Sequence, residues 1–493
     1  YQEYMNGALN SITPNLESFE NFEIFVQDST PLLEIGQINF DECGQFIGQL
    51  VNSYLQDLEQ NNLNNFLRFC VLILLLTSFL NGPVSNIIQG NEETASFFAT
   101  IIQLAFEIVA KTSEMQDALN QMYDSNTVYL ENSLVLFSTV FLKKFFTSPC
   151  EDVLQLVKIE KQQAFDLVIN RLLNDLTVFV PFPDTVIEIL NFLNTMLIKT
   201  DSKFSTFFSM NEMYNLLITH QRLLGIEIIE EIEKVSKISV ELYRFYSIPL
   251  KYDQLGEFLA FFDVKFSTFI LQNFSDSKGV LILFRQIEGV LKGSKSSYQY
   301  TFVWRWLLLK HTDHIIQCIT SQSSEFPVIK SICHVLVNLA NGANLNLPAS
   351  SSEGLQMVKH MHGFVNLINE KVTGSESVTY YMVKILASCI STNYANFGIM
   401  KLYGDDTIDQ IVMIFFEILK EWSFDSYSAY KNFLPILSNT FNSILRFLPE
   451  LIENDEYFAV VLNFYKNSMV NLRDFHSEFA VKDKEIYSNF TIL

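Results

Sequence analysis

The sequence has few basic residues. Its 493 residues include 33 lysines and arginines against 55 aspartates and glutamates, which gives a formal net charge of -22. A protein that binds the phosphate backbone of a nucleic acid needs an excess of cations, so this balance argues against direct nucleic-acid binding. The same balance favours a protein partner that carries a basic surface.

Cysteines are also few, and no two of them form a C-x-x-C pair. Scattered thiols in apolar surroundings are typical of buried cysteines in a reducing compartment, and we therefore expect no disulfide framework. The six are Cys43, Cys70, Cys150, Cys318, Cys333 and Cys389. The sequence begins at Tyr1 rather than at a methionine and shows no leader-like segment, so we expect it to be an internal fragment.

No apolar run is long enough to cross a bilayer. The most apolar segment, residues 66–80, contains an uncharged run only from Phe69 to Leu80, and Asn81-Gly82-Pro83 then ends it. A spanning helix needs about 20 apolar residues. We expect a helix that is buried on most sides, without membrane insertion.

The motifs of common enzyme classes are missing. The sequence contains no G-x-x-x-x-G-K-[ST], G-x-G-x-x-G, H-E-x-x-H or G-x-S-x-G pattern. His311 and His314 share a helix face, and His360 and His362 flank Met361, but no further ligands stand at a recognisable metal-site spacing. We expect no enzymatic activity, no cofactor and no metal, and we interpret these histidines as partly buried or surface imidazoles.

What the sequence does contain is apolar residues at spacings of three and four, the period of an α-helix. No stretch shows the sustained alternation of a half-buried strand, so the predicted class is all-α. The clearest helical stripes are Leu130, Leu134, Phe137, Phe141 and Phe145; Phe165, Val168, Leu172 and Leu176; Ile226, Ile229, Ile232 and Ile238; Phe258, Phe262, Phe266 and Phe269; and Ile411, Phe415, Ile418 and Trp422.

Helix breakers separate these stripes at fairly regular intervals, as at Pro181-Phe182-Pro183, Gly293-Ser294 and Phe326-Pro327. Several stripes are apolar on two sides, which suits a helix that packs on its partner and on the next pair. We predict an irregular HEAT/armadillo-like α-solenoid, with a globular bundle as the alternative. It would run continuously over residues 1–493, with a poorly defined N-terminal portion (1–62), stacked helix pairs (63–476) and a C-terminal tail (477–493).

Two acidic clusters are candidate protein-contact patches, although a charge run is more often a solvated helix face. A basic protein is the partner that their negative charge would favour. They comprise Glu227, Glu230, Glu231 and Glu233, and, at a predicted helix junction, Glu453, Asp455 and Glu456.

The segment NYANFGIMKLYGDD, residues 393–406, is unusually dense in aromatic, glycine and acidic residues. Gly404 suits a helix or turn end, and Asp406 would cap the next helix, with Asp409 in its first turn. This structural interpretation explains the acids without a ligand. A divalent-cation site and a partner contact are the alternatives.

The same segment closely resembles the exportin-7 (Ran-binding protein 16) family of nuclear transport receptors, in the importin-β superfamily. The matching positions are Tyr394, Asn396, Phe397, Gly398, Leu402, Tyr403, Gly404, Asp405 and Asp406. Residues 326–360 resemble a second family segment, at Pro327, Val328, Lys330, Val337, Asn341, Ser350, Ser351, Gly354 and Leu355. There the family has arginines where this chain reads NGANLN, residues 341–346, so any role of those arginines does not carry over.

The resemblance implies the middle and C-terminal part of a HEAT-repeat receptor that binds protein cargo and the GTP-bound form of the GTPase Ran. Such a receptor shuttles between nucleus and cytoplasm and contacts nucleoporins, and its main Ran-binding repeats are N-terminal to the part that this chain resembles. A non-transport HEAT-repeat scaffold of a stable protein assembly is the alternative, since the arginines are lost.

Overall fold

The computed structural model describes part of the chain. The described residues are 183–199, 231–250, 252–294, 296–346, 352–393, 406–423, 433–447 and 449–474, together with the single helical positions 49, 53, 56, 135, 136, 139, 142, 143, 172 and 176. The predicted helix at residues 66–80 and the predicted tail at 477–493 lie outside them, as does nearly all of the predicted portion 1–62.

The described residues form helices and their connections, with no strand among them, which confirms the all-α prediction. The helices are α11 (Pro183–Lys199), α13 (Ile232–Ser247), α14 (Tyr252–Leu271), α15 (Ser277–Gly293), α16 (Ser297–Arg305), the π-helix η4 (Trp306–Lys310), α17 (Thr312–Ser321), α18 (Phe326–Asn346), α19 (Ser352–Lys371), α20 (Glu376–Asn393), α22 (Thr407–Glu421), α24 (Leu434–Phe447), the 3-10 helix η6 (Pro449–Glu453) and α25 (Asp455–Asp474).

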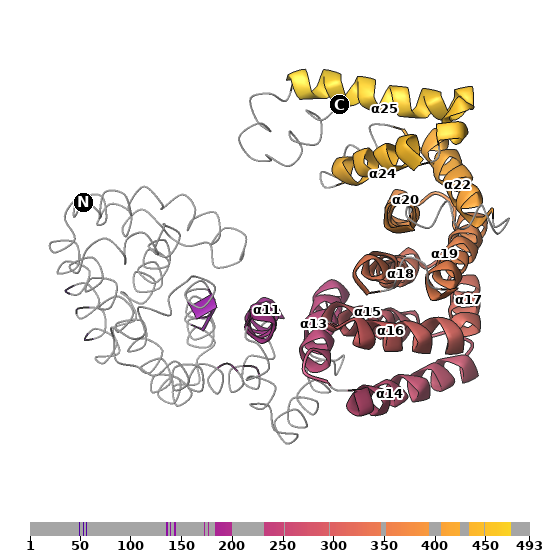
Figure 1. The fold of residues 1–493 in the computed structure, drawn as a ribbon. Helices are drawn as coiled ribbons and strands as arrows, with labels where there is room; N and C mark the ends of the chain where they lie inside the picture. The colour runs from indigo at the N-terminus through magenta and orange to yellow at the C-terminus, as the bar shows by residue number, and fades with distance from the viewer. Residues whose placement is uncertain are drawn as a thin grey trace. The chain divides into compact units, whose positions relative to one another are not determined.

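The chain divides into two compact units, residues 1–241 and 242–493. In the second unit the helices stack in two rows (Figure 1). One row runs α14, α16–η4–α17, α19, α22 and α25, and the other runs α15, α18, α20 and α24. Each helix packs on its neighbours along its row, and α14, α15, α16, α18, α19, α20 and α22 also pack on a helix of the other row. This nearest-neighbour stacking of helix pairs is the arrangement of an α-solenoid, as predicted.

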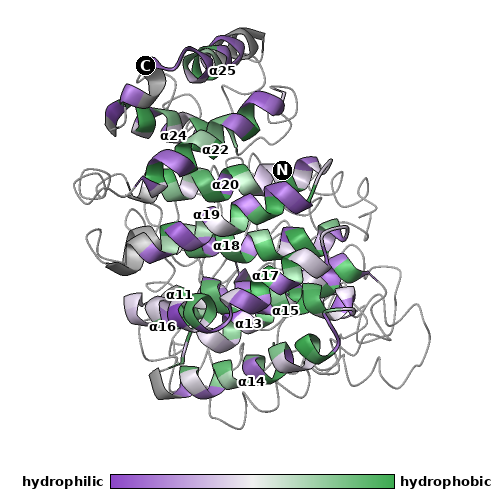
Figure 2. Ribbon diagram, turned by 90° about the vertical axis from the view of Figure 1, so that its right-hand side faces the viewer, coloured by the Kyte–Doolittle hydropathy of each residue, from purple (hydrophilic) through white to green (hydrophobic). Residues whose placement is uncertain are grey.

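The predicted stripes explain which face each helix buries. In α14, Phe262 and Phe266 are fully buried, and in α22, Ile411 and Phe415 are fully buried. Figure 2 shows the result along the stack, with hydrophobic and hydrophilic residues on different sides of the same helix. The sequence period therefore determines which side of each rod lies in the core.

Several helix ends fall at the predicted breakers. α11 begins at Pro183, α15 ends at Gly293, and Pro327 is the second residue of α18. Proline is tolerated in the first helical turn because the N–H that it lacks would have no partner within the helix there.

The turn between α14 and α15 is held by a buried aromatic residue. Asn273 and Phe274 both have positive φ (49° and 53°), a conformation that costs energy for residues other than glycine. Phe274 is fully buried, and its carbonyl oxygen accepts a hydrogen bond from the side-chain amide of Gln322 at the end of α17. The Gln322 side chain also accepts from the Ser277 hydroxyl at 2.7 Å. These contacts offset the cost of the turn and fix α15 against α17.

In the first unit, α11 packs on the N-terminal part of α13 through a buried amide. The side-chain nitrogen of Asn194, which is fully buried, donates to the backbone oxygen of Glu241 at 3.0 Å and to its carboxylate at 2.9 Å. These bonds satisfy the buried amide nitrogen, which would cost about 1–3 kcal/mol if it were left without a partner.

The described cysteines agree with the sequence interpretation. Cys318, Cys333 and Cys389 are buried free thiols, and burial raises the pKa of each to about 12. They therefore behave as small apolar core residues.

Two helical glycines differ in the space around them. A Cβ on Gly293, at the end of α15, would lie 2.6 Å from the backbone oxygen of Arg244 and 1.8 Å from the hydroxyl oxygen of Ser247, both in α13. A Cβ on Gly363, inside α19, would meet nothing within 4 Å. Gly293 is thus required for the close approach of α15 to α13, and Gly363 is not.

We expect Gly293→Ala to lower the free energy of unfolding by about 1–3 kcal/mol, because the backbone of α13 must move to admit the methyl group. Gly363→Ala is the matched control and should raise it by about 0.5–1 kcal/mol, because alanine is the better helix former. Urea unfolding followed by circular dichroism measures both. Equal shifts for the two variants would contradict the close packing of α15 on α13.

Candidate functional site

The first predicted acidic patch lies at the N-terminal end of α13. Glu231 and Glu233 are exposed there. Glu227 and Glu230 lie outside the described residues. The described half of this patch is therefore accessible to a partner.

Lysines of the same helix offset part of this negative charge. The ammonium group of Lys234 lies 2.7 Å from the Asp184 carboxylate and 3.6 Å from that of Glu231, and Lys237 lies 3.5 Å from Glu233. The hydrogen bond to Asp184 raises the pKa of Lys234 above its usual value. The patch is thus a mixed-charge surface, and its role in binding a basic partner stays a prediction.

The second predicted patch lies at the junction of η6 and α25. Glu453, Asp455 and Glu456 are all exposed. Lys420 of α22 lies 2.5 Å from Glu456 and 3.5 Å from Glu417, and its hydrogen bond lowers the pKa of Glu456. Among the described residues, Glu453 and Asp455 form no such pair with a lysine. Exposed ion pairs and carboxylates alone define no ligand site.

The family-motif segment lies almost wholly outside the described residues, which exclude 394–405. Its last residue, Asp406, immediately precedes α22, as predicted, and Asp409 is in the first turn. The predicted side-chain cap is wrong. Asp406 has ψ near 10°, so its carboxylate caps no backbone N–H and instead accepts from the side chain of Gln410 at 2.9 Å.

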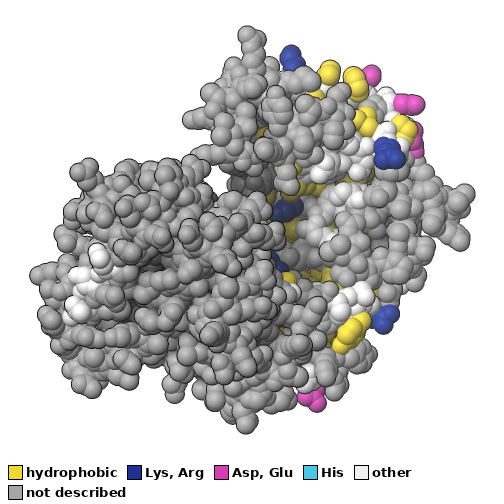
Figure 3. All heavy atoms as spheres, turned by 60° about the vertical axis from the view of Figure 1, so that its left-hand side comes forward, with side chains coloured by type: hydrophobic (Ala, Val, Ile, Leu, Met, Phe, Trp, Pro, Cys, Tyr) yellow, Lys and Arg dark blue, Asp and Glu magenta, His cyan; other side chains and the backbone are white. Residues whose placement is uncertain are grey.

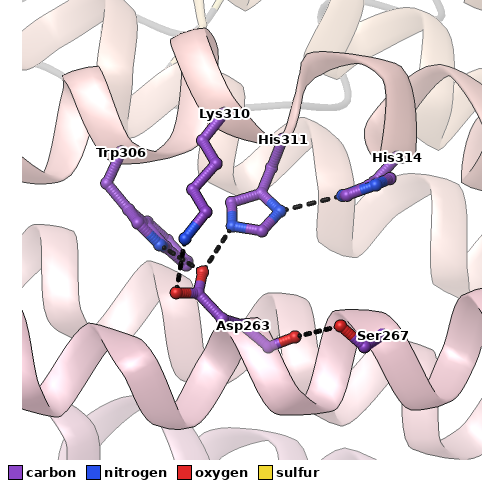
Figure 4. A network of polar contacts seen from close by, with 6 residues as sticks. All are labelled: Asp263, Ser267, Trp306, Lys310, His311 and His314. Atoms are coloured by element: carbon purple, nitrogen blue, oxygen red, sulfur yellow. Dashed lines mark hydrogen bonds and ion pairs between the residues drawn. The ribbon is translucent and has the colours of Figure 1, made fainter.

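A polar network joins α14 to the π-helix η4 and α17 (Figure 4). The carboxylate of Asp263 accepts from Trp306 Nε1 at 2.9 Å, from Lys310 Nζ at 2.6 Å and from the ring of His311 at 2.8 Å. The wider turn of a π-helix brings residues 306, 310 and 311 over the same point of the neighbouring helix. His311 in turn contacts His314 through their Nδ1 atoms at 2.9 Å.

The protonation of this network follows from its geometry. An ionised carboxylate only accepts, so Nε2 of His311 carries the proton and its Nδ1 accepts from His314. Burial lowers the pKa of His311, although its hydrogen bond to Asp263 acts in the opposite direction. Partial burial would raise the pKa of Asp263, but hydrogen bonds from Lys310, Trp306 and His311 lower it overall. Asp263 is thus a carboxylate and His311 a neutral imidazole at pH 7.

This network connects helices and lacks the parts of a catalytic or metal site. The hydroxyl of Ser267 donates to the backbone oxygen of Asp263 at 2.9 Å, so it is no activated nucleophile of the network. The two ring nitrogens of His311 point to different partners, so no common point for a metal exists. Among the residues that the structure describes, no group of three or more histidine, cysteine, aspartate or glutamate side chains could hold a metal ion.

The remaining candidate histidines, on α19, are partly buried, as the sequence interpretation has it. His360 stacks on Phe364 with ring centroids 6.3 Å apart, and the ring of His362 lies 3.1 Å from the side-chain amide of Asn366. Burial lowers the pKa of both imidazoles.

One set of charged residues that the sequence reasoning missed surrounds a buried carboxylate in α15. The side chain of Glu288 is 1% exposed and lies 2.5 Å from Arg285 and 2.7 Å from Lys292. The spacing R-x-x-E-x-x-x-K in residues 285–292 signals these pairs, because residues three and four apart share a helix face. His334 of α18 lies 3.6 Å from Glu288.

The comparisons with known proteins find one kind of relative. The chain is 23% identical over 221 residues to Ran-binding protein 17 of mouse and of human. The matched part is 40% of this chain and 20% of each relative, so the chain spans about one fifth of the curated relatives that it matches. No family model and no solved structure matches the chain.

This distant similarity does not assign the chain to the exportin-7 family in particular. In the described part of the chain, no helix is both long and apolar enough to cross a membrane.

The Asp263 network yields a stability prediction. We expect Asp263→Ala to lower the free energy of unfolding by about 2–3 kcal/mol, because the buried Trp306 and His311 lose their acceptor. Asp263→Asn keeps an acceptor oxygen and should cost about 1 kcal/mol. Urea unfolding followed by tryptophan fluorescence gives both values.

Asp313→Asn is the matched control, since Asp313 is an exposed carboxylate of α17. It should change the free energy of unfolding by less than about 0.5 kcal/mol. If Asp263→Ala cost no more than this control, the network would not hold α14 against η4.

Proposed function

We propose that the chain is part of a nuclear transport receptor of the exportin type, which binds protein cargo in a cycle coupled to GTP-bound Ran and shuttles between nucleus and cytoplasm. The observation that carries the proposal is the similarity over 221 residues to Ran-binding protein 17, whose name states that it binds Ran. The resemblance of residues 393–406 to the exportin-7 family supports the finer assignment.

The architecture suits this work. Stacked helix pairs present side chains of successive helices on one continuous face, which can contact a folded protein over a large area. Because each pair contacts only its neighbours, the stack can also bend when a partner binds. The proposed receptor needs no chemistry of its own, and any hydrolysis of GTP belongs to Ran.

The proposed partners are GTP-bound Ran, protein cargo with a basic surface, and nucleoporins. The net charge of -22 supports a basic cargo, since complementary potentials speed association and select partners. The mixed charge of the described α13 patch favours a cargo contact spread over the acidic surface rather than confined to Glu231 and Glu233.

A scaffold of a stable protein assembly is the second candidate. The chain has NGANLN at residues 341–346, without the arginines of the resembling family. In the structure these residues form the last turns of α18, so the change alters the end of a helix that stacks on α15 and α20. A scaffold would bind its partners without regard to the nucleotide on Ran.

The test is the retention of Ran by the protein expressed from its complete reading frame and immobilised on a resin. We expect Ran loaded with a non-hydrolysable GTP analogue to be retained at least tenfold more strongly than Ran loaded with GDP. A small GTPase of another class, loaded with the same analogue, is the control. Equal retention of the two nucleotide forms, or retention of neither above the control, would overturn the transport proposal and favour the scaffold.

A further inference from the structure

A group of cations lies across three helices of one row. Arg285 and Lys292 of α15, Lys330 of α18 and Lys384 of α20 form this group, which we call the cationic cluster. The three helices are consecutive neighbours in their row. Figure 3 turns the left-hand side of Figure 1 toward the viewer and shows, among the described residues, Lys and Arg side chains beside hydrophobic ones.

The cationic cluster has more positive charge than its own carboxylate can neutralise. Glu288 pairs with Arg285 and Lys292, and the Lys292 side chain is still 37% exposed. Lys330 is exposed and Lys384 half-buried, and neither forms an ion pair among the described residues. Among the described residues, Glu288 thus pairs with two cations, while Lys330 and Lys384 add two positive charges on the neighbouring helices of a strongly acidic chain.

The charges of the cationic cluster shift the pKa values of Lys384 and His334, which indicates that these charges lie close together. Burial lowers the pKa of Lys384, and the nearby charge of Lys292 lowers it further. Burial, followed by the charges of all four members of the cationic cluster, lowers the pKa of His334 to about 3. His334 is therefore neutral at pH 7, and its 3.6 Å approach to Glu288 is no ion pair.

Aromatic rings lie between the cations. The ring of Tyr381 is 5.9 Å from Lys330 Nζ and 4.4 Å from the His334 ring, and the ring of Tyr380 is 5.8 Å from Lys384 Nζ. The ammonium groups of both lysines thus lie near aromatic rings, whose electron-rich faces attract cations. The surface thus offers several ammonium groups with partly apolar ground between them.

We propose that the cationic cluster is a docking site for an acidic peptide segment of a partner protein. Neighbouring helices of a stack lie about 8–10 Å apart, so the three helices span about 16–20 Å. An extended peptide rises about 3.3 Å per residue, so a segment of about five or six residues covers the site. Carboxylates along that segment neutralise the charges that Glu288 leaves unbalanced. The inference does not rest on the proposed transport cycle.

A nucleic acid fits this surface less well. Screening confines the attraction to about 8 Å at physiological salt, so a short peptide experiences mainly the cationic cluster itself. A nucleic-acid strand carries a charge on every nucleotide, and its phosphates would continue onto the surrounding acidic surface of a chain with net charge -22.

Fluorescence anisotropy with a labelled twelve-residue peptide, three repeats of Glu-Asp-Ser-Gly, tests the site in the whole protein. We expect the peptide to bind at least tenfold more tightly than the same peptide with glutamine and asparagine in place of its acids. The double variant K330Q/K384Q should weaken binding at least tenfold, whereas K330R/K384R should keep it within about threefold. Both lysines lack ion pairs among the described residues, and the melting temperature shows whether each variant is folded.

The matched control is K371Q/K466Q, which removes two exposed lysines of α19 and α25. It should leave binding of the peptide within twofold of the parent protein. Equal weakening by the two glutamine variants would overturn the proposal, as would equal binding of the acidic and neutral peptides. Tighter, K330Q/K384Q-sensitive binding of a twelve-nucleotide oligothymidine would overturn it in favour of a nucleic-acid site.

Discussion

The structure of the second unit depends on apolar contact between consecutive helices of the same row. α18 packs on α15 on one side and on α20 on the other, and its residues Ile332, Val335, Leu336 and Leu339 are completely buried. Each such helix hides most of its circumference, so only a narrow strip remains for solvent. Lys292, Lys330 and Lys384 reach solvent on those strips, whereas Glu288 is buried beside them, and helix stacking therefore determines which side chains can meet a partner.

The helices and many of their ends follow from local rules. The three-and-four spacing of Phe262 and Phe266 predicts the buried face of α14, and Pro183 and Gly293 mark helix ends because of their own backbone chemistry. The side-chain cap that the sequence predicts at Asp406 is absent, and local rules could not foresee this. Helix position alone does not set the ψ angle of the preceding residue, on which the direction of the carboxylate depends.

The polar clusters are a different case, because their members are far apart in sequence. Asp263 and His311 are 48 residues apart, and the link depends on the π-helical turn that precedes His311. The pairs of Glu288 within α15 have a sequence signal, but Lys330 and Lys384 join them only once α18 and α20 are stacked. One-dimensional patterns predict contacts within a helix and not contacts across a stack.

Charges of both signs lie close together on the described surface of this acidic protein. The described carboxylates at the start of α13 and at Glu456 have lysines close by, so their negative charge is partly offset. The cationic cluster is a local departure from this background. In the proposed receptor, the two kinds of surface would select partners of opposite charge at different places.

Amide hydrogen exchange with peptide-level mass spectrometry tests most directly whether stacking along the row supports the rest of the structure. α18 and α20 are covered on both sides within their row, whereas α25 has exposed Phe458 and Leu462. If stacking along the row supports the structure, amides in the middle of α18 and α20 exchange at least tenfold more slowly than those of α25. Exchange in α18 and α20 as fast as in α25 would contradict it.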